Sequence, residues 1–127
     1  MNERISFITR QEQKIMVIDF RECGAKEMLA LLGEVQQAVA RHPRNSLVTL
    51  GDFTHAEVDR SVATRMKEVL VMDRPYVKRS AWVGTETFPK VYLENFKSFT
   101  QRHFAFFNSR EEAMEWLVKE ETESQSQ

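Results

Sequence analysis

The order of apolar and polar positions along the chain predicts alternating strands and helices. Residues 4–9 alternate, with Ile5 and Phe7 expected to face inward, whereas residues 14–20 hold an unbroken apolar run from Ile15 to Ile18 that is typical of a strand covered on both faces. The polar turn between them indicates an antiparallel hairpin. The later segments are a helix over 25–41, a strand over 46–50, a helix over 58–73, a strand over 76–84, a helix over 89–100, a strand over 103–107 and a helix after Ser109.

This order predicts an α/β fold with a five-stranded mixed sheet, in which the first strand is antiparallel and the others are parallel, and with four covering helices. Apolar residues recur every three or four positions in the first helical segment, at Met28, Leu29, Leu32, Val35 and Val39. Ser109 and Glu112 have the spacing of a capping box, in which each side chain satisfies the other residue's backbone donor. Because no linker divides the chain, residues 1–121 are expected to form one domain, and residues 122–127 a disordered polar tail.

Composition and charge narrow the class of protein. The 127 residues include 18 Lys and Arg against 19 Asp and Glu, so the formal net charge is -1 and no strong field favours nucleic acid. No apolar run reaches the roughly 18 to 20 residues that cross a bilayer. Together with the absence of a secretory pattern, this predicts a cytoplasmic protein that is not an integral membrane protein. The one cysteine, Cys23, cannot form an internal disulfide.

The segment after the third predicted strand is the first candidate site. Loops at the carboxyl ends of parallel strands commonly bind ligands or partners, and this loop gathers the polar residues Asp52, Thr54, His55, Glu57, Asp59 and Ser61. Acid–base catalysis by His55 with a neighbouring aspartate would need a nucleophile and an oxyanion donor, and no such motif accompanies them. The pattern favours a turn closed by Asp52 and Thr54 and a helix start capped by Glu57 or Asp59. We therefore expect no enzyme activity.

The remaining candidate groups are the histidines and the basic residues. His42, His55 and His103 lack the paired spacing of metal ligands, so neither a metal nor a cofactor is predicted. Basic residues are frequent from Arg60 onward, but acidic residues are interleaved with them. This mixture favours a solvated face over a functional basic patch. The basic positions are Arg60, Arg65, Lys67, Arg74, Lys78, Arg79, Lys90, Lys97 and Arg102.

An aromatic stripe is the second candidate feature. Phe88, Tyr92, Phe96 and Phe99 recur at steps of four, four and three, which places them on one face of the predicted helix over 89–100. Packing against the sheet, including Phe106, is the interpretation that we favour. An exposed stripe would instead line a cavity for an apolar ligand or form a subunit contact, such as a homodimer interface.

The order of elements, with LVTLGDFTHAEVDRS at its centre, resembles the anti-sigma-factor-antagonist (STAS) fold, and more closely its SpoIIAA-like, or STAS/SEC14-like, bacterial branch. RPYVKRSAWVG and FAFFNSREEAMEWL are also similar to that branch, so the resemblance covers nearly the whole chain. The better-known antagonists place an aspartate and then a phosphorylatable serine at the start of the second helix. Here Asp59 falls on the aspartate and Arg60 on the serine.

This departure changes what the resemblance implies. An arginine cannot receive the phosphate that switches partner binding. Ser61 lies one residue later, about 100° around a helix, so a shifted phosphosite stays an open alternative. We expect a non-enzymatic regulatory or protein-interaction module that works without the usual phosphoserine switch and uses residues 51–61 as its contact surface. The SEC14-like part of the resemblance implies the alternative, a small carrier of lipid or another apolar molecule.

Overall fold

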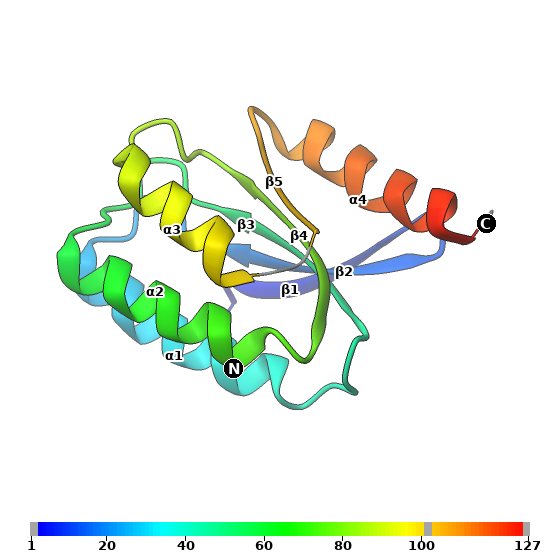
Figure 1. The fold of residues 1–127 in the computed structure, drawn as a ribbon, viewed down its shortest axis with the longest axis horizontal. Helices are drawn as coiled ribbons and strands as arrows, with labels where there is room; N and C mark the ends of the chain where they lie inside the picture. Colours follow the sequence, from blue (N-terminus) through cyan, green and yellow to red (C-terminus); the bar gives the residue numbers. More distant parts are fainter. Residues whose placement is uncertain (1–2, 101–102, 126–127) are drawn as a thin grey trace.

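The computed structural model describes residues 3–100 and 103–125, and in this part of the chain a five-stranded sheet has the strand order β1-β2-β3-β4-β5 (Figure 1). β1 is antiparallel to β2, and β2 to β5 run parallel, as the sequence predicted. The elements are β1 (Ile5–Arg10), β2 (Gln13–Asp19), α1 (Ala25–Val39), β3 (Leu47–Asp52), α2 (Arg60–Asp73), β4 (Val77–Val83), α3 (Lys90–Thr100), β5 (His103–Phe107) and α4 (Arg110–Gln125).

The predicted hairpin is confirmed, with a shorter turn than expected. Arg10 pairs with Gln13, so only Gln11 and Glu12 form the turn, and both have positive φ angles of 51° and 68°. Two successive residues with positive φ are typical of a type I′ turn, whose twist matches that of the flanking strands. Phe7 was expected to face inward, yet 40% of it is exposed because it lies on an edge strand.

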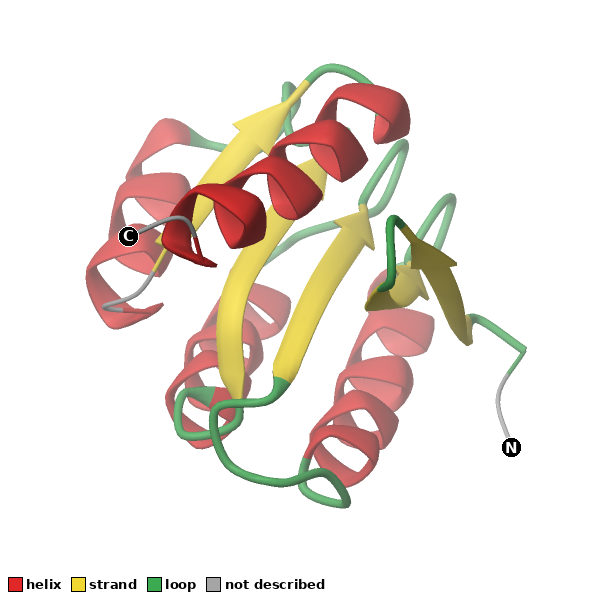
Figure 2. Ribbon diagram, turned by 90° about the vertical axis from the view of Figure 1, so that its right-hand side faces the viewer, coloured by secondary structure: helices red, strands yellow, loops and turns green. Residues whose placement is uncertain are grey.

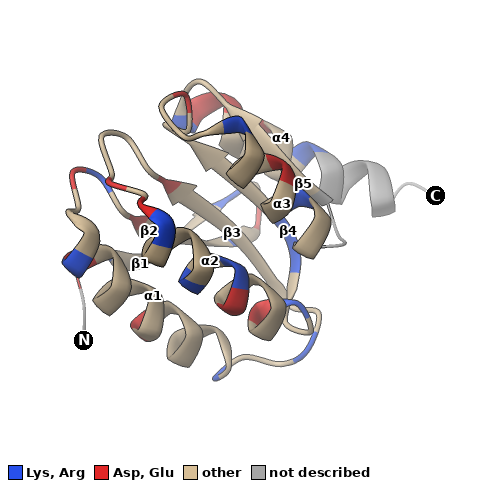
Figure 3. Ribbon diagram, turned by 60° about the vertical axis from the view of Figure 1, so that its left-hand side comes forward, with Lys and Arg blue, Asp and Glu red and all other residues tan. Residues whose placement is uncertain are grey.

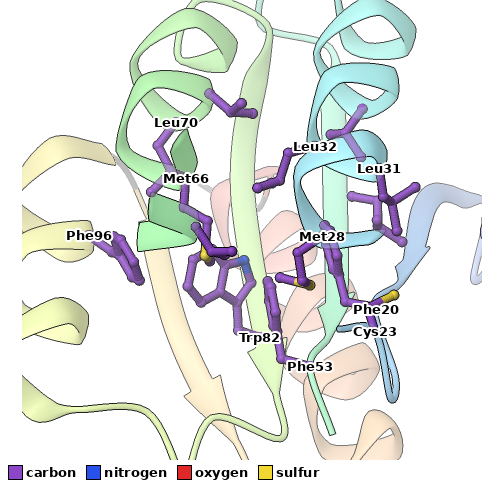
Figure 4. Packing of buried hydrophobic residues seen from close by; sticks show 14 of the residues in the cluster. Phe20, Cys23, Met28, Leu31, Leu32, Phe53, Met66, Leu70, Trp82 and Phe96 are labelled. Carbon is purple, nitrogen blue, oxygen red and sulfur yellow. The ribbon is translucent and has the colours of Figure 1, made fainter. Parts of the chain in front are cut away.

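Helices α1, α2 and α3 cover one face of the sheet with a core rich in aromatic rings. Figure 4 shows Phe53 and Trp82 pointing from the sheet toward α1 and α2, with Phe96 of α3 beside Trp82. The ring centroids of Phe53 and Trp82 are 4.5 Å apart, and those of Trp82 and Phe96 are 5.6 Å apart. Offset and edge-to-face contacts of this kind add to the free energy gained by burial alone.

Helix α4 covers the opposite face, as Figure 2 shows with α4 in front of the sheet and the other three helices behind it. Its buried residues Ala113, Leu117 and Val118 pack on the second face of β2, β3 and β4. The expected capping residues are present. The Ser109 hydroxyl accepts a hydrogen bond from the Glu112 amide (3.2 Å), but it also donates to the Glu112 carboxylate (3.3 Å), so the carboxylate meets the hydroxyl rather than the backbone.

The last helix is longer than its apolar pattern predicted. We expected it to end near Glu120, with a disordered tail over 122–127, but α4 continues to Gln125; residues 126–127 lie outside the described part. Residues 120–125 contain no apolar side chain, so periodicity gave no signal there, whereas glutamate and glutamine are good helix formers. None of the described helices, α4 included, is long and apolar enough to cross a membrane.

The strand order has a direct bearing on where a site can lie. From β2 to β5 each new strand is added on the same side of the previous one, and the three crossover helices share one face. Ligand crevices of open α/β sheets form where the strand order reverses. Within the described ranges the strand order of the parallel strands never reverses, so these strands form no crevice of this kind.

Candidate functional site

Two aspartates end neighbouring parallel strands at one edge of the sheet. Asp19 is the last residue of β2, Asp52 is the last residue of β3, and the two are paired in register. Each is followed by a phenylalanine, and the rings of Phe20 and Phe53 stack with centroids 4.6 Å apart. The repeated Asp-Phe pair thus sends carboxylates to the strand ends and rings into the core.

Arg110, at the start of α4, joins the two carboxylates. Its Nε donates to Asp52 Oδ2 at 2.7 Å, and its Nη2 lies 3.8 Å from Asp19 Oδ1. Burial alone would raise the pKa of Asp52, but the hydrogen bonds from Arg110 and Thr54 outweigh it and hold that pKa below its ordinary value. Asp52 is therefore a buried carboxylate kept ionised by an arginine from the opposite face of the sheet.

Asp19 accepts hydrogen bonds from two further arginines. Arg21 Nε and Nη2 donate to its two carboxylate oxygens, each at 2.9 Å, and Arg4 Nη1 donates to its backbone carbonyl at 2.9 Å. The Arg21 hydrogen bond is the main cause that lowers the pKa of Asp19. The ends of β2 and β3 consequently carry a network of two carboxylates and three arginines.

The loop after β3 is tied to its neighbours through its backbone. Thr54 donates its amide and hydroxyl to Asp52 Oδ1 at 3.1 and 2.7 Å, which confirms the predicted turn. The Glu22 amide donates to the Thr54 carbonyl and the Glu57 amide to the Cys23 carbonyl, both at 2.9 Å. These bonds link the loop after β3 to the loop after β2, so the loop has a defined shape.

Gly84 completes this packing from the end of β4. Its φ of +76° lies in the left-handed region, and a Cβ atom built on it would lie 2.4 Å from the Thr54 amide nitrogen. Only glycine fits so close to another backbone at such an angle. The turn made by Asp52 and Thr54 therefore rests directly on Gly84.

The helix start predicted at Glu57 or Asp59 is capped by Asp59. Its carboxylate accepts the Val62 amide at 2.9 Å and the Ser61 hydroxyl at 2.9 Å. The hydrogen bond from the Val62 amide is the main cause that lowers the pKa of Asp59. Asp59 is thus engaged by the helix, and the Ser61 hydroxyl by Asp59.

Asp59→Ala is expected to lower the melting temperature, because the first turn of α2 loses its cap. The matched control Glu57→Ala, at a second exposed carboxylate of the same loop, should melt like the wild type. Since the folded pKa of Asp59 is lowered, its contribution is present above the unfolded value and is lost as pH falls through the folded value. Thermal unfolding between pH 7 and pH 3 checks this, and equal melting of both variants would contradict it.

The predicted site residues therefore divide into two groups. Asp52 is buried and Thr54 is half-buried, and both shape the loop. The remaining five are exposed, although Asp59 and Ser61 bond to each other. His55 has a φ of 60°, in the left-handed region. The exposed set is His55, Glu57, Asp59, Arg60 and Ser61.

Comparison with known proteins concerns the fold. No family model matches the chain, and no curated protein matches it. Among solved structures, the crystal structure of an uncharacterized DUF3478-family protein from Shewanella loihica PV-4, described as having a SpoIIAA-like fold, is similar with a TM-score of 0.68. The alignment covers 89% of this chain and 91% of that chain at 18% sequence identity. This chain has the SpoIIAA-like fold. The resemblance inferred from the sequence is thereby confirmed at the level of the fold.

Within this SpoIIAA-like fold the aromatic stripe of α3 lies mainly in the core. Phe88 and Phe96 are buried, Tyr92 and Phe106 are half-buried, and Phe99 is 39% exposed. A cavity of about 50 Å³ does lie beneath α1 and α2, but none of these five aromatic residues lines it. The favoured interpretation, packing against the sheet, is correct for most of the stripe.

Sequence reasoning missed several residues of the carboxylate–arginine network at the ends of β2 and β3. Asp19, Arg21, Arg110 and Gly84 belong to the network or support it, and none was predicted. One signal was present: the same Asp-Phe pair closes both β2 and β3. Nothing in the order of residues places Arg110 there, because that contact depends on the side of the sheet that α4 covers. Among residues 3–100 and 103–125, no three His, Cys, Asp or Glu side chains are grouped to hold a metal ion.

Proposed function

We propose that the chain is a non-enzymatic protein-interaction module of the STAS-like type, and that its contact surface is the exposed loop side formed by His55, Glu57, Arg60 and Ser61. The supporting observation is that one set of loop residues fixes the backbone and another set is exposed to solvent. Buried or internally bonded groups fix the loop backbone, whereas these side chains stand in solvent on a fixed frame. A preorganised loop loses little conformational entropy on binding, which favours recognition.

The proposed module acts without the usual phosphoserine. Arg60 is the first residue of α2, where the resemblance implies a phosphorylatable serine, and its side chain is exposed. The surface at this helix start therefore carries a constant positive charge instead of a switchable negative one. We infer that the partner is bound constitutively and recognises the arginine.

A capture experiment in the native host tests the proposal. Tagged wild-type protein should retain a defined partner, and the double variant His55→Ala/Arg60→Glu should lose it while its melting temperature stays close to wild type. Arg44→Glu is the matched control, because Arg44 is an exposed arginine in the loop before β3, at the opposite edge of the sheet. Equal capture by the wild type and the double variant would contradict the proposal.

The alternative function, an apolar-ligand carrier, needs a cavity lined by the aromatic stripe. The cavity of about 50 Å³ is lined by other residues and is smaller than the usual range of ligand pockets, roughly 300 to 1,000 Å³. Phe99 of the stripe also lines a larger hollow of about 540 Å³, but that hollow is open to solvent and does not enclose a ligand. The carrier is therefore kept as an outcome of the test. Native mass spectrometry of the captured protein would reveal a copurified lipid and overturn the proposed function.

A further inference from the structure

Three large apolar side chains are exposed together on the outer surface of α2 and α3. Val71 is 40% exposed, Met72 54% and Phe99 39%. All three line one open hollow of about 540 Å³, which also includes Gln36, Thr64, Arg65, Lys67 and Glu68. Contiguous exposed apolar surface with a polar border is typical of an interaction site.

A second hollow continues the first toward the amino end of α2. It has a volume of about 120 Å³ and lies between α2 and α3. Thr64 and Lys67 line both hollows, so the two adjoin, and we call them together the α2–α3 groove. The second hollow is lined by Arg60, Ala63, Thr64, Lys67, Tyr92, Asn95 and Phe96.

The groove is lined by both apolar and basic side chains. Glu68 is the one acidic residue among its described lining residues, and its carboxylate lies 3.5 Å from Arg65. Arg60 and Lys67 are not balanced in this way, and Lys67 Nζ lies 5.6 Å from the centre of the Phe99 ring. Figure 3 shows the charged positions of α2 and α3, which lie next to each other in the fold.

Most of the acidic residues interleaved with the basic ones in the sequence do not line the groove. Asp73 is buried, and neither Glu86 nor Glu94 lines the groove. Positions 60, 64, 67 and 71 follow the helical spacing that places residues on one face. Of the interleaved acidic residues, Glu68 alone lines the described groove, and it pairs with Arg65.

We propose that the α2–α3 groove binds an acidic amphipathic segment of a partner protein. Carboxylates of the segment would pair with Arg60 and Lys67, and its apolar side chains would cover Val71, Met72 and Phe99, as in helix-in-groove recognition. The inference rests on the proposed function, since Arg60 belongs to both surfaces. It adds the chemistry of the partner and a second contact area.

Other occupants fit the groove less well. A second copy of the chain using the same face would bring the same surplus of positive charge, and like charges repel. An anionic membrane surface is usually bound by about four to eight clustered basic residues, whereas two unbalanced cations line the described groove. An acidic protein segment satisfies both the charges and the apolar surface.

Site-specific photo-cross-linking in the host tests the inference. The photoreactive residue p-benzoylphenylalanine is placed at Met72 in the groove, at His55 in the loop, and at Leu29 of α1 as an exposed apolar control. The Met72 probe should cross-link to an acidic amphipathic segment that mass spectrometry identifies. The Leu29 probe should give no such product.

Charge-reversal variants test whether the positive charge of the groove contributes to binding. Lys67→Glu should reduce the Met72 cross-link, and should weaken binding of the identified segment as a synthetic peptide by about tenfold or more. Lys90→Glu is the matched control, because Lys90 is an exposed lysine of α3 that does not line the groove, and it should bind like the wild type. Raising the salt concentration should weaken wild-type binding more than Lys67→Glu binding.

The outcomes separate this inference from the proposed function. A protein cross-link at His55 without one at Met72 would overturn the groove and leave the loop surface intact. The absence of both would overturn both proposals. A cross-link from Met72 to lipid, to a second copy of the chain or to a basic segment would also overturn the inference.

Discussion

Gly84→Ala is expected to lower the free energy of unfolding by roughly 2 to 4 kcal/mol. An alanine at a φ of +76° costs about 1 to 2 kcal/mol, and its Cβ would lie 2.4 Å from the Thr54 amide nitrogen and 2.7 Å from the Thr54 Cα. Overpacking against a fixed backbone typically adds about 1 to 3 kcal/mol. Because the crowded atoms belong to the loop after β3, the substitution should also displace that loop.

Urea unfolding measures the loss, and amide chemical shifts of residues 52–57 measure the displacement. Gly33→Ala is the control, because Gly33 lies within α1 and a Cβ there meets nothing within 4 Å. Alanine is favoured over glycine in a helix by up to about 1 kcal/mol, so this variant should be at least as stable as the wild type. Wild-type stability in Gly84→Ala would show that the loop can move away without cost.

Arg110→Gln is expected to cost roughly 2 to 3 kcal/mol at neutral pH. The change leaves the buried Asp52 carboxylate without its cationic partner, and removal of one member of a buried ion pair costs about 3 to 5 kcal/mol. We place this pair below that range because 34% of the Arg110 side chain is exposed to solvent, which screens the interaction. Chemical denaturation at pH 7 checks the value, with Arg44→Gln as an exposed control.

The effect of Arg110→Gln should depend on pH. The folded pKa of Asp52 is lowered in the wild type, so the stabilisation is present above the unfolded value of about 3.9 and is lost as pH falls through the folded value. In the variant that pKa loses the lowering effect of Arg110, and only the hydrogen bonds from Thr54 still oppose the effect of burial. The difference between the two proteins should therefore shrink below about pH 4. A difference that stays constant from pH 7 to pH 3 would show that Arg110 acts through packing.

The sequence correctly predicted features that depend on the residues of a single strand or helix. The unbroken apolar run of β2 correctly predicted burial on both faces, and Ser109 correctly marked the start of α4. The end of α4 was placed too early because residues 120–125 have no apolar side chain to reveal periodicity. The position of Phe7 was predicted only in part, since alternation gives the face of a strand but not whether a helix covers its edge.

The candidate site was predicted less completely, because its interactions join distant parts of the chain. The turn of Asp52 and Thr54 and the cap at Asp59 are local, and the sequence indicated both. The contact of Arg110 with Asp52 spans 58 residues and depends on α4 crossing the second face of the sheet. The basic residues of α2 appeared balanced in the sequence, and only the helical arrangement separates Arg60 and Lys67 from the nearby carboxylates.

Helix α4 has a consequence for biosynthesis. It is translated after every strand that it covers, and Ala113, Leu117 and Val118 bury the second face of β2, β3 and β4. Until α4 docks, the apolar second face of the sheet is open to chaperones or to neighbouring chains. The insertion of Arg110 between Asp19 and Asp52 ends that exposure.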